Sequence, residues 1–86
     1  MAAPREHGPV DRFLTYLNVE RNASEHTRRG YTLDLEQFFT HLGHQRIADV
    51  TPMEIRQFVV HLSTRRVGRR TIARKLSCLR SFFRFL

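Results

Sequence analysis

Residues 24–43, SEHTRRGYTLDLEQFFTHLG, predict the longest helix of the chain. Ser24 is a favourable N-cap because its hydroxyl can accept a hydrogen bond from a first-turn amide, and Glu25 places negative charge near the positive helix end. Gly43 supplies the stop. Between these ends, apolar side chains recur at helical spacing, at Tyr31, Leu35, Phe38, Phe39 and Leu42. The pattern indicates an amphipathic helix with one buried face.

Three further segments share this period. The first begins at Gly8-Pro9, where proline suits the first helical position, and ends near Arg21-Asn22. Another begins at Thr51-Pro52-Met53-Glu54, which has the form of a capping box. The last extends from about Arg69 to the end of the chain, after a tight turn that Gly68 allows. Their apolar stripes are, in order, Val10, Phe13, Leu14 and Leu17; Ile55, Phe58, Val59 and Leu62; and Ile72, Leu76, Leu79, Phe83 and Leu86.

No segment alternates as a strand does, so the sequence predicts an all-α fold. Short connections favour neighbouring helices packed as two helical hairpins in a compact four-helix bundle. We expect residues 1–8 to form a disordered tail and residues 9–86 to form one domain. Because the chain stops inside the apolar run Ser81-Phe82-Phe83-Arg84-Phe85-Leu86, we also expect a longer parent protein to continue beyond it.

Charge is distributed very unevenly along the 86 residues. The net charge is +7, from 15 Lys and Arg against 8 Asp and Glu. All eight acids lie in residues 1–54, where six arginines leave a net charge of −2, whereas residues 55–86 hold nine cations and no acid, a net charge of +9. Such unneutralised charge favours a polyanionic partner, with nucleic acid as the leading candidate.

The remaining composition narrows the class of protein. Cys78 is the single cysteine, so an internal disulfide and a cysteine-rich zinc module are excluded, and a reducing compartment is expected. No apolar run has the length of a membrane span, and the first residues lack the apolar stretch of a signal peptide. We therefore expect a cytoplasmic, nucleoid-associated protein without a membrane partner.

Two motifs resemble a known family. Ser24, Thr27, Tyr31, Asp34 and Leu35 match the start of the second helix in the N-terminal core-binding domain of tyrosine recombinases. Residues 71–86, TIARKLSCLRSFFRFL, look like the fourth helix of Xer-type recombinases, and the two motifs stand in the right order and at a suitable separation. The resemblance covers residues 10–86.

The resemblance implies a SAM-like bundle of two crossed hairpins whose second and fourth helices face the major groove of double-stranded DNA. It also implies that the tyrosine nucleophile and its partner residues lie in a separate downstream catalytic domain, so that this chain is not itself an enzyme and needs no cofactor. Sibling recombinase subunits would be partners of the full-length protein, while the chain alone is expected to be monomeric.

The charge pattern selects residues for this DNA-binding role. On the fourth helix Arg70, Arg74, Ser77, Ser81 and Arg84 follow helical spacing away from the apolar stripe, with Thr71 and Lys75 on one flank and Arg69 at the start. On the second helix the start would add free amides and positive charge to a phosphate grip. The candidates there are Ser24, Thr27, Arg28 and Arg29.

Two other function classes compete with this prediction. One is a free-standing helical DNA-binding regulator, although the Arg-rich turn before the last helix lacks the usual short recognition helix. The other is an interaction module for an acidic protein. A catalytic domain in the full reading frame would distinguish the recombinase from the regulator, and salt-sensitive DNA binding would exclude the protein module.

Several single residues have a plain structural interpretation. His41 and His44 are spaced for a shared metal, but zinc needs three or four ligands and no convincing third appears, so a solvated helix end is preferred. His26 and His61 have no evident partner. Tyr31 is expected to be a core aromatic, and Cys78 a small packing residue. Gly30 indicates close approach of a neighbouring helix or of DNA, with helix packing favoured.

Overall fold

The computed structural model describes residues 8–43 and 46–86. These hold four α-helices and one 3-10 helix: α1 (Pro9–Val19), α2 (Glu25–Leu42), η2 (Ile47–Asp49), α3 (Pro52–Thr64) and α4 (Arg69–Phe85). This part of the chain contains no strand, and the all-α prediction is confirmed. Of the predicted N-terminal tail, only Gly8 lies inside the described residues, as the N-cap of α1. None of the helices in the described part combines the length and apolar character needed to cross a membrane.

Helix ends follow the predicted local chemistry. The Ser24 hydroxyl accepts a hydrogen bond from the Thr27 amide at 3.1 Å, and Gly43 ends α2 in the left-handed region at φ 79°. Thr51 and Glu54 form a reciprocal capping box, with distances of 3.2 and 3.0 Å. Each of these caps gives a hydrogen-bond partner to a backbone N–H or C=O group that has none within the helix.

The turn between α3 and α4 differs from the prediction. Gly68 has φ −68° and serves as the N-cap of α4, so its freedom to adopt positive φ is not used. The left-handed residue of this turn is Arg66, at φ 63°. An arginine there carries steric strain that a glycine would avoid.

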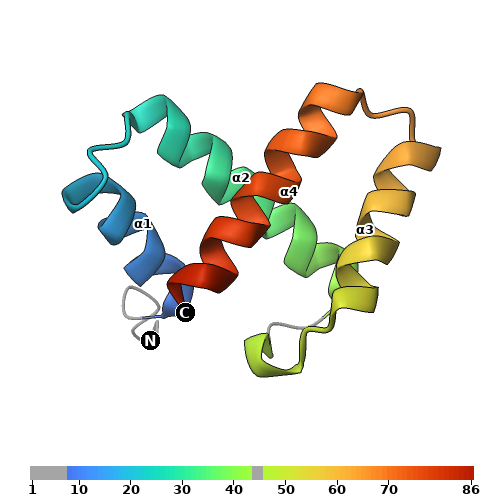
Figure 1. Cartoon of the computed structure of the whole chain (residues 1–86), viewed down its shortest axis with the longest axis horizontal. Helices are drawn as coiled ribbons and strands as arrows, with labels where there is room; N and C mark the ends of the chain where they lie inside the picture. The colour runs from blue at the N-terminus through green and yellow to red at the C-terminus, as the bar shows by residue number, and fades with distance from the viewer. Residues whose placement is uncertain (1–7, 44–45) are drawn as a thin grey trace, which may run out of the picture.

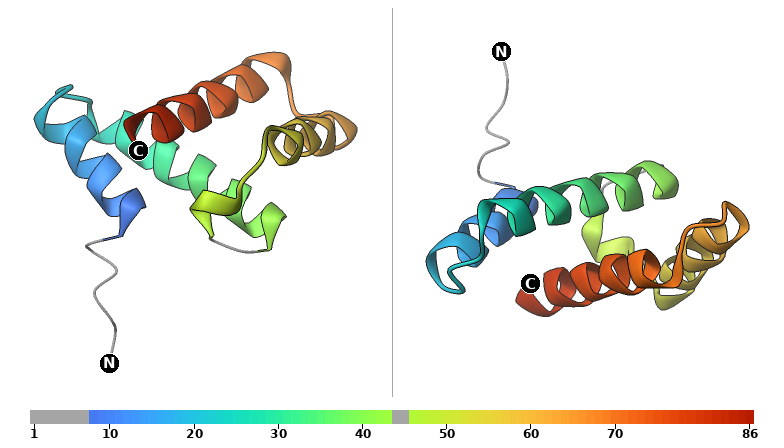
Figure 2. Two further views of the ribbon diagram at one scale, coloured as in Figure 1. Left: turned by 60° about the horizontal axis from the view of Figure 1, so that its bottom comes forward. Right: turned by 90° about the horizontal axis from the view of Figure 1, so that it is seen from above.

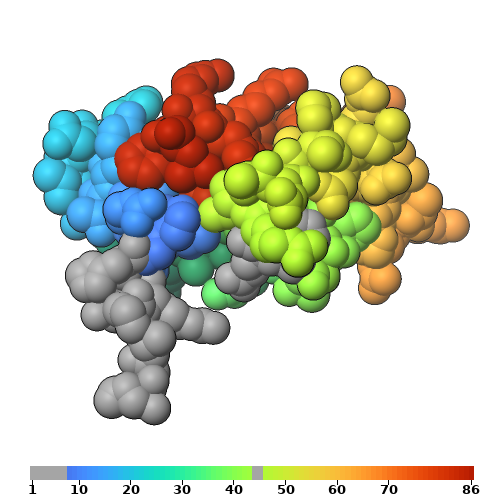
Figure 3. Space-filling model, turned by 90° about the horizontal axis from the view of Figure 1, so that it is seen from below, coloured from blue at the N-terminus to red at the C-terminus, as the bar shows by residue number. Residues whose placement is uncertain are grey.

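The helices form two crossed hairpins, as predicted. In Figure 1, α2 and α4 cross as an X, with α1 beside one pair of arms and α3 beside the opposite pair. The views in Figure 2 place α2 and α4 in separate layers. Figure 3 shows the molecule from below. The segment around η2 lies in the middle, with one end of α1 and one end of α4 on one side of it and α3 on the other. The N-terminal arms of α2 and α4 diverge on the other side of the crossing.

A core rich in phenylalanine joins the two hairpins. Phe13 of α1 contacts Phe82 of α4, with ring centroids 5.4 Å apart, and Phe38 of α2 contacts Phe58 of α3 at 5.3 Å. The buried apolar residues are Phe13, Leu17, Leu35, Phe38, Phe39, Phe58, Leu62, Cys78, Leu79 and Phe82. Because every α-helix contributes to this set, α2 and α4 are held in a fixed crossing.

The buried face of α4 is rotated from the predicted stripe. Its buried residues are Lys75, Cys78, Leu79 and Phe82, whereas Leu86, placed in the stripe by its apolarity, is 51% exposed. The rotation arises because α4 packs against α1, α2 and α3 together, so all three helices determine which of its residues are buried. Ile72, Leu76 and Phe83 are half-buried on one edge of this face.

Candidate nucleic-acid interface

The basic C-terminal third of the chain presents almost all of its charge to solvent. Eight of its nine cations are exposed arginines, and the ninth, Lys75, is buried. Arg74 is the only one of the eight that forms an ion pair with another residue in the described part of the chain. The exposed set is Arg56, Arg65, Arg66, Arg69, Arg70, Arg74, Arg80 and Arg84.

Two strips of side chains meet where α2 crosses α4. On α4, Arg70, Arg74, Ser77 and Ser81 are spaced by four, three and four residues, so they share one side of the helix. On α2, residues 27, 30 and 34 share a side in the same way. The strips join at an ion pair between Asp34 and Arg74.

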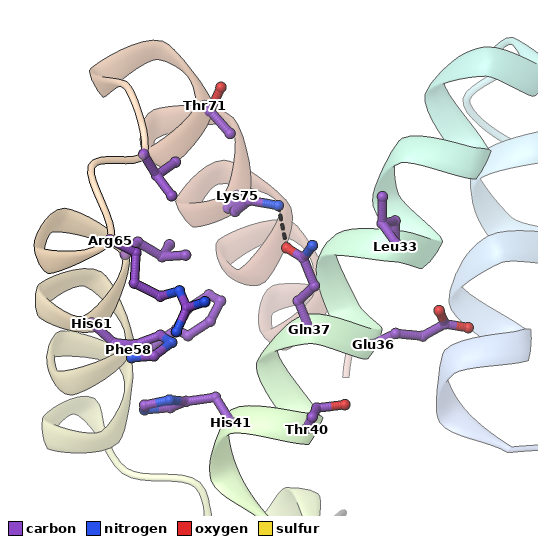
Figure 4. A pocket seen from close by; sticks show the side chains of 12 residues that line it. Leu33, Glu36, Gln37, Thr40, His41, Phe58, His61, Arg65, Thr71 and Lys75 are labelled. Atoms are coloured by element: carbon purple, nitrogen blue, oxygen red, sulfur yellow. Dashed lines mark hydrogen bonds between the residues drawn. The ribbon is translucent and has the colours of Figure 1, made fainter.

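This crossing contains a buried carboxylate shared by two cations. Asp34, 1% exposed, accepts hydrogen bonds from Arg74 Nη2 at 2.8 Å, from Arg74 Nε at 3.2 Å and from Lys75 Nζ at 2.9 Å. Lys75 also donates to Gln37 Oε1, the dashed bond in Figure 4. One negative and two positive charges leave the cluster at +1. The bond to Asp34 raises the pKa of Arg74, and half of the Arg74 side chain stays in solvent.

The position of Lys75 differs from its predicted place on the flank of a basic surface. Its side chain is 7% exposed and its ammonium group points at α2. A lysine is buried at tolerable cost only when it is paired and hydrogen-bonded, as it is here by Asp34 and Gln37. Lys75 therefore belongs to the helix crossing rather than to the exposed strip of α4.

The basic residues at the start of α2 bond to neighbours in their own stretch of chain. Arg28 Nε donates to the carbonyl of Ala23 at 3.4 Å, and Arg29 pairs with Glu25 at 2.8 Å in an exposed ion pair. Ser24 Oγ donates to Thr27 Oγ1 at 3.0 Å. Of the four α2 candidates, only Thr27 thus lies on the strip that leads to Asp34.

Arg69 and Thr71 lie off the α4 strip. Arg69 is exposed on a flank of α4 outside the strip, whereas Thr71 is half-buried and lines a groove of about 640 Å³. Figure 4 shows this groove, with Leu33 and Gln37 on the α2 side and His61 and Arg65 on the opposite wall.

The histidines have an arrangement that the sequence did not indicate. His61, predicted to have no partner, lies 4.8 Å from His41 between ring centroids, across the gap from α3 to α2. His44 lies outside the described residues, so the predicted spacing with His41 has no structural counterpart here. The described residues hold no group of three or more His, Cys, Asp or Glu arranged for a metal ion.

Gly30 is not a packing residue of this domain. A Cβ built on it would meet no described atom within 4 Å, so the interpretation as close approach of a neighbouring helix is wrong. Tyr31 and Cys78 take their predicted structural places. The Tyr31 ring stacks on Phe13 at 6.3 Å, and burial raises its pKa. Cys78 is fully buried with its thiol toward the Tyr31 carbonyl at 3.7 Å, and burial raises its pKa to about 12.

The Asp34 cluster is the feature that sequence reasoning missed. Its signal was present, because Asp34 shares the apolar side of α2 with Tyr31, Leu35 and Phe38. An acid inside an apolar stripe needs a buried cation. That cation, Lys75, lies 41 residues further along the chain, so no local pattern indicates it.

Two crossed helical hairpins with one strongly basic helix define a small, all-helical SAM-like module. The chain belongs to the family described as "Phage integrase, N-terminal SAM-like domain", which matches residues 10–86. This confirms the resemblance found in the two helix motifs.

Named relatives agree with this assignment. The chain is 44% identical over 80 residues to the tyrosine recombinase XerC of Oceanobacillus iheyensis, covering 90% of this chain and 26% of that protein. It is 45% identical over 78 residues to XerC of Listeria innocua, covering 87% and 26%, and 40% identical over 87 residues to XerC of Syntrophus aciditrophicus, covering 90% and 28%. The chain thus spans about a quarter of the length of these relatives. No solved structure matches it.

Proposed function

We propose that this chain is the DNA-binding module of a site-specific tyrosine recombinase or integrase, and that it grips a core recombination half-site through α2 and α4. The observation that carries the proposal is the concentration of exposed arginines in residues 55–86, five of them on α4. Residues 55–86 place eight arginines in solvent and contain no acid to neutralise them. A duplex supplies the dense negative charge that such a surface requires.

The two strips, on α2 and α4, indicate how the domain would lie on a DNA duplex. A major groove about 12 Å wide admits an α-helix, so α4 can lie in it with Arg70, Arg74, Ser77 and Ser81 toward the DNA. Long arginine side chains reach base edges or phosphates, and the serine hydroxyls hold phosphates. On α2, the open space beside Gly30 lets a DNA backbone approach next to Thr27. Arg28 and Arg29 contribute from a more distant position.

The module binds and positions DNA, while strand cleavage and rejoining belong to another domain of a longer recombinase. Sibling subunits would associate through that longer protein, and the 86-residue chain alone would be a monomer. Action on DNA of this kind takes place at the nucleoid in the cytoplasm. None of these roles requires a metal or cofactor in this module.

The test is an NMR titration of the isotope-labelled chain with a short duplex at two salt concentrations. Amide shifts are expected at residues 24–34 and 69–81, and they should shrink as salt increases. If about five cations meet phosphates, the slope of log K against log salt should be about −4.5.

Two arginine variants sharpen this test. Arg70→Gln should reduce the steepness of the slope by about 0.9, because one phosphate contact is lost. Arg56→Gln is the matched control, since it removes another exposed charge, near the start of α3, and it should leave the slope unchanged. Absence of duplex binding at low salt would overturn the proposal in favour of an acidic protein partner.

A further inference from the structure

We infer that Arg74 reads a guanine base in the major groove and that Asp34 holds it in position to do so. This inference rests on the proposed function, since it requires α4 to enter the groove. It assigns a base-reading role to one arginine among eight on the strength of its contacts.

The hydrogen bonds of Arg74 leave one edge of its guanidinium group available. An arginine carries five N–H donors, one on Nε and two on each Nη. Asp34 accepts from Nε at 3.2 Å and from Nη2 at 2.8 Å. The outer edge retains parallel N–H groups on Nη1 and Nη2. Guanine presents two neighbouring acceptors in the major groove, O6 and N7, which match such a pair of donors.

The contact with Asp34 fixes the orientation of the Arg74 guanidinium group, and the cluster still keeps a net positive charge. Asp34 is buried, so it cannot follow a moving partner, and the two bonds to it set the plane of the Arg74 guanidinium. Lys75 donates to the same carboxylate and offsets its charge, which leaves the cluster at +1 with Arg74 as its exposed member. Pre-organisation of this kind reduces the entropy lost when the side chain binds a base.

The other arginines of α4 lack this support. Arg69, Arg70, Arg80 and Arg84 are exposed and form no ion pair with a described residue. A mobile arginine suits phosphates, which are present at every step of a duplex and require no fixed geometry. Gly30 lies one turn before Asp34 on the same strip, so no side chain there obstructs access to the crossing.

The first experiment selects duplexes bound by the 86-residue chain from a library with a randomised centre. The selected duplex is then compared with one in which a single guanine is replaced by 7-deazaguanine, which lacks the N7 acceptor. At one position the wild-type chain should prefer guanine by about 10- to 100-fold over other bases. The 7-deaza substitution at that position should remove a large part of this preference.

Matched variants connect the preference to Arg74. Arg74→Lys keeps the charge and an ion pair with Asp34, but its single nitrogen cannot offer two parallel donors to guanine. It should bind the selected duplex with an unchanged salt slope and bind all bases at that position about equally. Arg70→Lys is the control and should retain the guanine preference, because a point charge serves a phosphate as well.

The outcomes separate this inference from the proposed function. A guanine preference that survives in Arg74→Lys, or salt-dependent binding with no guanine preference at any position, overturns the role of Arg74 and leaves the DNA-binding module intact. Absence of binding to every duplex at low salt overturns both. If Arg74→Lys does not fold, the 7-deazaguanine comparison with the wild-type chain still tests the contact.

Discussion

Gly30 occupies the interior of α2, where a glycine lowers helix stability by about 1 kcal/mol relative to alanine. Nothing in the described structure fills the space that its missing side chain leaves. We predict that Gly30→Ala raises the free energy of unfolding by about 0.5–1 kcal/mol, because only helix propensity changes. The same variant should bind duplex DNA more weakly, since the added methyl group lies on the strip proposed to face DNA. Urea unfolding and fluorescence anisotropy measure the two effects.

The matched control for Gly30→Ala is Asn18→Ala on α1. Asn18 is exposed and lies outside both strips, so its replacement should also raise stability, by about 0.5 kcal/mol, but leave DNA binding unchanged. Equal binding by Gly30→Ala and the wild-type chain would show that DNA does not approach α2 at this residue.

The ionisation of Cys78 should make the free energy of unfolding depend on pH in the alkaline range. Burial raises its pKa in the folded chain to about 12, against about 9 for an exposed thiol. The unfolded chain therefore loses this proton first as pH rises, and ionisation favours unfolding. We predict that the contribution of Cys78 to stability is fully present below pH 9 and falls by about 1 kcal/mol per pH unit between pH 9 and pH 12. Urea unfolding at a series of pH values measures this loss.

Cys78→Ala is the control for the alkaline effect. It lacks the thiol but keeps Tyr31, whose pKa is also raised by burial, and the other groups that ionise at high pH. It should start less stable because a buried sulfur is removed, yet lose less stability as pH rises. Parallel pH profiles for the two chains would contradict a buried thiol at this position.

At the scale of helices, the sequence predicts where elements begin and end better than which way they face. The starts of α2 and α3 are encoded by residues within one turn, Ser24 with Glu25 and Thr51 with Glu54. The orientation of α4 depends on three other helices, which no local pattern describes. Its apolar residues predict a stripe through Leu86, but the packing of α4 centres its buried face on residues 75–82.

In the candidate site, too, features that depend on one helix could be predicted from the sequence, and features that depend on packing between helices could not. Exposure of the α4 arginines and of Ser77 could be predicted from helical spacing, because it depends on one helix alone. The burial of Lys75 could not, since it requires Asp34 and Gln37 from α2 at the crossing. Charge and position at the N-terminus of α2 select Arg28 and Arg29, but neither feature predicts their local bonds to Ala23 and Glu25.

The crossing of α2 and α4 contains the carboxylate of Asp34, which Arg74 and Lys75 share. Asp34→Asn leaves Lys75 buried without its carboxylate, so we expect a loss of about 3–5 kcal/mol in the free energy of unfolding. The double variant Asp34→Leu, Lys75→Met removes both buried charges and should recover most of this loss, because Arg74 can remain in solvent. Urea unfolding measures both. A stable Asp34→Asn chain would show that the shared carboxylate does not fix the crossing.

At the scale of the whole molecule, charge separation sets two opposite responses to salt. Residues 1–54 carry −2 and residues 55–86 carry +9, and most of the positive charge lies on exposed arginines without ion pairs in the described structure. These arginines repel one another in the free chain, and salt screens the repulsion. The Debye length falls from about 30 Å at 0.01 M to about 8 Å at 0.15 M ionic strength. The same screening weakens attraction to a duplex.

We therefore predict that adding sodium chloride over this range raises the Tm of the free chain by about 2–4 °C, a gain of roughly half a kcal/mol, while DNA binding weakens. Calorimetry of the free chain measures the first effect. The variant with Arg69, Arg80 and Arg84 all changed to Gln should melt at a higher temperature in low salt and respond less to added salt, because three unpaired charges are removed from α4. A Tm that falls with salt would instead mean that attraction between the acidic N-terminal part and α4 outweighs repulsion within the basic third. In that case acidic residues of the same chain would partly neutralise the arginines before DNA binds. The slope of log K against log salt would then be shallower than five phosphate contacts require.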